Sequence, residues 1–122
     1  MTANSINGRH VYYAILAGAN EVIQNKSELD RINVFPVPDG DTGANLTSTM
    51  KAVMENIRLE NEVDLVLSSA ADGALMGARG NSGLIFAQLI YGWYMEVKSK
   101  ETLTQEELIH SLQGALKRLY GV

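Results

Sequence analysis

Apolar residues recur every three or four positions along almost the whole chain, and this spacing restricts the fold to amphipathic helices packed on one another. The apolar faces mark five helices: Val11, Ile15 and Val22; Leu46, Met50 and Val53; Val63, Leu67 and Ala70; Ile85, Leu89 and Met95; Leu108, Leu112, Leu116 and Leu119. No stretch alternates convincingly with a period of two, so strands are not expected. The pattern predicts a single all-α domain over residues 1–122.

The limits of three of these helices follow from the sequence. The first is expected over about residues 9–24 and the fourth over about residues 81–98. The fifth begins after Thr104, because Thr104 and Glu107 have the spacing of a capping box, in which each side chain accepts from an otherwise unpaired backbone N–H. We expect the leucines of this fifth helix to form a buried stripe.

Composition and charge exclude several classes of protein. The formal net charge is −4 and the basic residues are scattered, which argues against a nucleic-acid-binding face. There is no cysteine, so disulfides and thiolate metal sites are excluded. The first ten residues lack the apolar core of a signal peptide, and no apolar stretch is long enough for a membrane span. We therefore expect a cytoplasmic protein.

Two segments interrupt the helical pattern. Residues 33–43, NVFPVPDGDTG, contain both prolines of the chain, and residues 77–83, GARGNSG, contain three glycines. Proline restricts φ and glycine permits positive φ, so both segments can form tight, defined loops. Each is followed directly by a predicted helix. The free N–H groups and the dipole of a helix N-terminus favour negative charge, so both loops are candidate anion sites.

The first loop carries two carboxylates, Asp39 and Asp41, separated by one glycine. Extended backbone would place both on the same side, where they repel unless a cation lies between them. Oxygen ligands of this kind suit Mg²⁺. The alternative is a turn in which Asp41 or Thr42 caps the next helix. A calcium loop is excluded because Ala44 and Met50 stand where it requires glycine and glutamate.

The second loop offers backbone N–H groups, the Ser82 hydroxyl and the Arg79 guanidinium to a phosphate. It is not a P-loop, because no Gly-Lys-Ser/Thr follows, and it lacks the final glycine of a nucleophile elbow. The alternative is a plain connection between two helices. No residue of the chain is assigned as a catalytic acid, base or nucleophile.

Both loops, in this order, resemble those of a known family. Residues 29–45 resemble the signature of the DhaL-like domain, and NVFPVPDGDTG is similar to its version in bacterial fatty acid kinases. GARGNSG is similar to that family's second glycine-rich motif, and SINGRHVYYAILAGANEV to its first helix. The resemblance implies a barrel of antiparallel helices, with ATP at one end and two Mg²⁺ ions held by aspartates.

The resemblance also assigns site residues. The metal ligands it implies are Asp39 and Asp41, with Asn33 as the third and Asp30 as the alternative to it. The dihydroxyacetone-kinase branch of the family has histidine where this chain has Thr42. The residues expected at the nucleotide are Thr42, Gly43, Asn45, Arg79, Gly80, Ser82 and Gly83.

The function implied is transfer of the ATP γ-phosphoryl group to a fatty-acid carboxylate, which a DegV-type fatty-acid-binding protein would present. The alternatives are phosphorylation of dihydroxyacetone and a non-catalytic helical module that binds nucleotide or a partner. The chain is shorter than the family's domain, so we expect it to be incomplete at its C-terminus. About five helices cannot close the barrel, and an exposed apolar flank and a homo-oligomer are expected.

Overall fold

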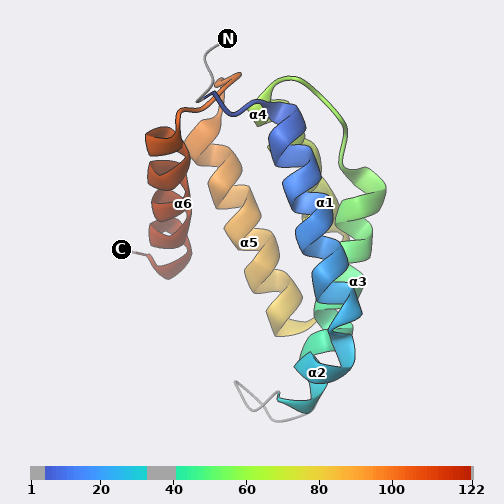
Figure 1. The fold of residues 1–122 in the computed structure, drawn as a ribbon. Coiled ribbons are helices and arrows are strands. Elements are labelled where there is room, and N and C mark those ends of the chain that lie inside the picture. Colours follow the sequence, from blue (N-terminus) through green and yellow to red (C-terminus); the bar gives the residue numbers. More distant parts are fainter. Residues whose placement is uncertain (1–4, 33–40, 122) are drawn as a thin grey trace.

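Six α-helices account for most of the described residues, 5–32 and 41–121, in a computed structural model of the chain (Figure 1). They are α1 (Gly8–Gln24), α2 (Lys26–Arg31), α3 (Thr42–Asn56), α4 (Val63–Gly77), α5 (Gly80–Val97) and α6 (Gln105–Tyr120). In the described ranges there is no strand, only an isolated bridge between Ile6 and Leu103. The all-α prediction is confirmed, and the predicted limits of the first and fourth helices agree to within a residue.

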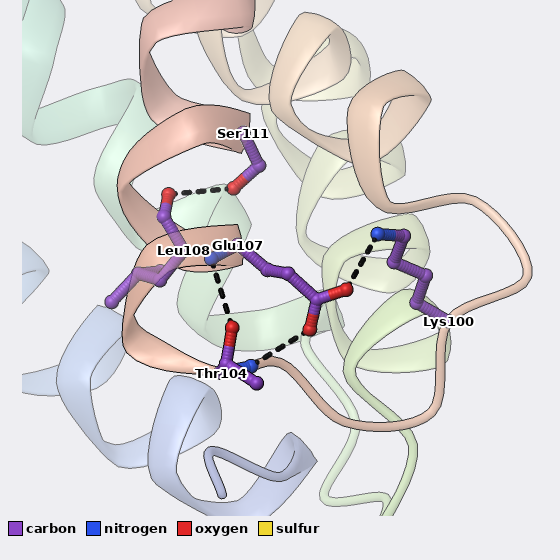
Figure 2. Close-up of polar contacts among 5 residues, drawn as sticks. All are labelled: Lys100, Thr104, Glu107, Leu108 and Ser111. Carbon is purple, nitrogen blue, oxygen red and sulfur yellow. Dashed lines mark hydrogen bonds and ion pairs between the residues drawn. The ribbon is translucent and has the colours of Figure 1, made fainter. Parts of the chain in front are cut away.

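The starts of α1 and α6 are fixed by capping boxes. In α6, Thr104 Oγ1 accepts from the Glu107 amide at 3.1 Å and Glu107 Oε1 accepts from the Thr104 amide at 2.9 Å, as predicted (Figure 2). The bond from the Thr104 amide and the ion pair with Lys100 lower the pKa of Glu107. In α1, Asn7 and His10 bond reciprocally in the same way. These side chains satisfy N–H groups that have no partner within the helix.

The short helix α2 was not predicted. Its six residues, KSELDR, include no buried side chain, so no apolar period marks it. Ion pairs between Lys26 and Asp30 and between Glu28 and Arg31 link successive turns. The helix packs on the start of α3, where a Cβ added to Gly43 would overlap the Lys26 carbonyl oxygen. Glycine at this position therefore lets α2 cross α3 closely.

The core is built around α4, which contacts α1, α3 and α5. Its inward face, Val63, Val66, Leu67, Ala70 and Ala74, is completely shielded from solvent. Small side chains on this face allow the neighbouring helices to approach closely. The core thus holds α3 and α5 in fixed positions on either side of α4.

An apolar groove runs along the flank of the molecule between α1 and α6, with α5 as its floor. Among the described helices α6 contacts only α5, so nothing closes the space between α6 and α1. The groove has a volume of about 540 Å³ and is lined almost entirely by apolar side chains, including Ile15, Phe86, Trp93, Leu112 and Leu116.

The groove corrects one prediction and confirms another. Leu112 and Leu116 were expected in a buried stripe, but they are 40% and 45% exposed because no helix packs over them. The expected exposed apolar flank is present. No helix in the described part of the chain is both long and apolar enough to cross a membrane.

Candidate functional site

Helices α3 and α5 begin at the same end of the molecule and contact each other (Figure 1). Helix α3 starts at Thr42, near the end of the first segment that interrupts the helical pattern. The second segment, residues 77–83, is shorter as a loop than predicted: Gly77 ends α4 and α5 starts at Gly80, so only residues 78 and 79 lie outside helices. The fold therefore brings together two helix N-termini, at Thr42 and Gly80, that are 38 positions apart in sequence. Unpaired N–H groups and aligned peptide dipoles give such an end partial positive charge, which favours an anion.

At the start of α3, Asp41 occupies the N-cap position, but its side chain makes no capping hydrogen bond. The bond comes from α2 instead, where Asp30 Oδ1 accepts from the Ala44 amide at 3.0 Å. The Asp41 side chain is exposed. The alternative prediction is thus right about the position of Asp41, which is the N-cap residue of α3, but the side chain that accepts from the first turn is that of Asp30.

The Asp30 carboxylate is held in its charged form. Burial acts to raise its pKa, but hydrogen bonds from the Ala44 amide, the Lys26 ammonium and the Gly43 amide outweigh this, so the pKa lies below 3.8. Lys26 Nζ is 3.2 Å from Asp30 Oδ2. Asp30, considered above as the alternative to Asn33, is thus placed at the N-terminus of α3, where it bonds to two amides of the first turn.

The second loop packs against α3 at Gly80. This residue has φ +69°, a left-handed conformation that glycine adopts without strain, and a Cβ added to it would overlap the side-chain amide of Asn45. Asn45 itself is buried. The contact between Asn45 and Gly80 joins the two predicted motifs directly.

Thr49 connects the same two segments one helical turn further along α3. Its side chain is completely buried, and its hydroxyl donates to the Asn45 carbonyl oxygen at 2.9 Å. The Thr49 hydroxyl oxygen accepts from the Arg79 amide at 3.3 Å. A Cβ added to Gly83 would overlap this hydroxyl. Sequence reasoning missed Thr49, although a polar residue four positions after Asn45 lies on the same helix face.

The structure places the predicted nucleotide residues in two groups. Thr42, Gly43 and Asn45 lie in the first turn of α3, and Arg79, Gly80, Ser82 and Gly83 lie at the start of α5. Gly43 is buried, with its amide directed at Asp30. Arg79 is exposed and Ser82 is half-buried. The fold therefore brings both groups to one end of the molecule.

The predicted metal ligands are described only in part, because Asn33 and Asp39 lie outside the described residues. Within residues 5–32 and 41–121, no three carboxylate or imidazole side chains are close enough together to hold a metal ion. The two histidines lie elsewhere: His10 is at the opposite end of α1, and His110 is on α6. No imidazole stands beside the paired helix N-termini.

Comparison with known proteins identifies the family to which the chain belongs. Protein YloV of Bacillus subtilis (strain 168) is 38% identical over 98% of this chain. An uncharacterized protein of Staphylococcus aureus (strain USA300) is 35% identical over 96% of it. The chain spans 22% of the length of each of these relatives. The model of the DAK2 domain matches residues 36–122, which include the second loop and all but the first three residues of the first, and the chain therefore belongs to the DAK2 domain family.

Proposed function

We propose that this chain is the ATP- and magnesium-binding domain of a kinase that transfers the γ-phosphoryl group of ATP to the carboxylate of a fatty acid. The observation that carries the proposal is the contact of Asn45 with Gly80, which sets the N-termini of α3 and α5 side by side. Membership of the DAK2 domain family and the resemblance of the first loop to that of fatty acid kinases support it.

The described residues suit a polyphosphate. The first turn of α5 offers backbone N–H groups, and Arg79 and Ser82 add a positive charge and a hydroxyl. Asp41 lies beside them at the N-cap position of α3, where it is exposed, and its carboxylate would be one of the magnesium ligands. Asp39, with Asn33 or Asp30, would complete the ligands of the two magnesium ions.

The proposed roles are binding and positioning. When bound, magnesium supplies positive charge that offsets the charge of the phosphate oxygens. Arg79, Ser82 and the amides of α5 would hold the phosphates in place. A fatty-acid carboxylate, with a pKa of about 4–5, is already ionised at neutral pH and needs no general base. This agrees with a site beside which no histidine lies.

The acyl chain would come from a separate DegV-type fatty-acid-binding protein. The product would be an acyl phosphate: a carboxylate oxygen bonds to the γ-phosphorus, and ADP leaves with the electrons of the broken P–O bond. Dihydroxyacetone is the second candidate substrate, which the match to the DAK2 domain favours. Its hydroxyl is not ionised at neutral pH and would need a general base, and this chain has Thr42, which is no base, where that branch has histidine.

A non-catalytic module is the remaining alternative, because the chain spans only 22% of the relatives' length. Calorimetric titration of the 122-residue chain with ATP, with and without Mg²⁺, separates binding from no binding. We expect magnesium-dependent binding that Asp41→Asn weakens at least about tenfold, the effect of losing one charged ligand. Asp72→Asn, an exposed acid on α4, is the matched control.

Phosphoryl transfer is then measured with a fatty acid, presented by a DegV-type protein, and with dihydroxyacetone. Transfer to the fatty acid alone supports the proposal, and transfer to dihydroxyacetone alone replaces it with the second candidate. Binding of Mg-ATP without transfer to either would leave a nucleotide-binding module. Absence of any magnesium-dependent binding would overturn the proposal for this chain.

A further inference from the structure

We infer that Thr49 is a positioning residue that sets the N-terminus of α5, and with it the phosphate-binding amides, relative to the start of α3. This inference rests on the proposed function, because it concerns the same site. Thr49 does not reach the surface: its side chain has no exposed area. Any effect on a nucleotide must therefore act through the start of α3 and the second loop, whose Gly77 and Arg79 its hydroxyl contacts.

The Thr49 hydroxyl is used both as a donor and as an acceptor. Its proton goes to the Asn45 carbonyl oxygen at 2.9 Å, while the Gly77 carbonyl oxygen lies at 3.4 Å. Its oxygen accepts from the Arg79 amide at 3.3 Å. Residue 79 is the N-cap of α5, so this bond fixes the point at which that helix begins. A helix start held by one buried hydroxyl cannot shift without leaving a polar group unpaired.

Two glycines of the second loop are explained by the same contact. Gly80 leaves room for the Asn45 side chain, and Gly83 leaves room for the Thr49 hydroxyl. Asn45 and Thr49 lie four residues apart, on one face of α3, and together they form a polar ridge that fits against GARGNSG. Both glycines therefore serve the packing of α5 on α3, in addition to any contact that their amides make with phosphate.

The inference predicts different effects for two nearly isosteric substitutions. Thr49→Val keeps the shape but removes both hydrogen bonds, so the Arg79 amide must find another acceptor and the start of α5 moves. Thr49→Ser keeps the hydroxyl. Calorimetric titration with Mg-ATP should show a loss of affinity of about tenfold or more for Thr49→Val, and near wild-type affinity for Thr49→Ser.

A matched control separates positioning from general destabilisation. Val53→Ala removes two methyl groups at a completely buried position one turn further along α3, away from both loops. It should lower the melting temperature yet bind Mg-ATP with wild-type affinity at a temperature where every variant is folded. Equal affinities for wild type and Thr49→Val would overturn the inference. Failure of the wild type to bind would instead count against the proposed function.

A second measurement tests the geometry without nucleotide. In the wild-type background, Gly83→Ala should lower the melting temperature, because the new methyl group overlaps the Thr49 hydroxyl. In a Thr49→Ala background that oxygen is absent, and the other atoms near the new methyl group lie at 3.6 Å, an ordinary contact distance. In that background Gly83→Ala should lower the melting temperature by much less. Equal losses in both backgrounds would show that Thr49 and Gly83 are not coupled.

Discussion

Gly80 is a residue at which one added methyl group should disturb both the backbone and the site. It has φ +69°, and a Cβ would overlap the side chain of Asn45. The left-handed backbone alone costs a non-glycine residue about 1–2 kcal/mol, so Gly80→Ala should lower the free energy of unfolding by at least that amount. Urea denaturation followed by circular dichroism measures it.

Gly18 provides the control for this prediction. It lies within α1, is exposed, and has no atom within 4 Å of an added Cβ. Gly18→Ala should raise the free energy of unfolding by about 0.5–1 kcal/mol, because alanine loses less backbone freedom in a helix. If the two substitutions change stability equally, the conformation assigned to Gly80 is wrong.

Asp30 makes stability depend on pH. Its folded-state pKa lies below the ordinary 3.8, so as the pH falls the unfolded chain takes up the proton first. Its contribution is therefore complete above about pH 4 and is lost as the pH falls through the folded-state pKa. Denaturation of wild type and Asp30→Asn at a series of acidic pH values measures this contribution of Asp30 to stability. The difference in stability between them should shrink toward low pH; a constant difference would contradict the assigned hydrogen bonds.

For single residues, the sequence predicted which two segments form the candidate site, but it did not predict every contact between their side chains. The two loops and the residues in them were identified from glycine, proline and aspartate patterns. The pattern could not show that Asp30 rather than Asp41 caps α3, because that bond crosses fourteen positions of sequence. Nor could it show the role of Thr49, since a threonine within a helix becomes informative only when its neighbours in space are known.

Among the elements, α6 offers the clearest test of local sequence signals. Its capping box satisfies the amides of Thr104 and Glu107 (Figure 2). Thr104→Ala should lower the free energy of unfolding by about 0.5–2 kcal/mol, whereas Thr104→Ser should have a small effect. Thermal denaturation of the two variants checks this, and an equal loss in both would mean that the hydroxyl does not cap the helix.

Helix prediction succeeded where one face is buried and failed where none is. The five long helices have an apolar period because each packs on a neighbour, and the limits of α1 and α5 followed from it. The six residues of α2 pack through backbone and charged side chains, so they leave no such period. The leucines of α6 are a different case. Their period predicts the helix correctly, but it cannot show whether another element covers them.

For the whole molecule, the groove between α1 and α6 exposes a continuous apolar surface. We propose that the chain self-associates through it, because exposed apolar patches of this kind favour association. Leu112→Ser combined with Leu116→Ser should raise the dimer dissociation constant at least about tenfold, the effect of losing part of the burial of two leucines. Ile109→Ser, at an exposed position of α6 outside the groove lining, is the control.

Sedimentation equilibrium at several protein concentrations gives these dissociation constants. A wild-type chain that stays monomeric at high concentration, or an equal effect of Ile109→Ser, would contradict self-association through the groove. The all-α class of the molecule was predictable from periodicity alone. The meeting of the N-termini of α3 and α5 at one end of the molecule was not predictable from periodicity, because it depends on how both helices pack against α4.

The central claim is that the paired N-termini of α3 and α5 bind the phosphates of Mg-ATP. Two-dimensional NMR of the ¹⁵N-labelled 122-residue chain, titrated with Mg-ATP, tests it most directly. We predict amide shift changes concentrated in residues 41–45 and 79–83, which need magnesium and which in Asp41→Asn need at least about tenfold more nucleotide. Changes confined to other surfaces, such as the groove along α6, or no changes at saturating nucleotide, would contradict the claim.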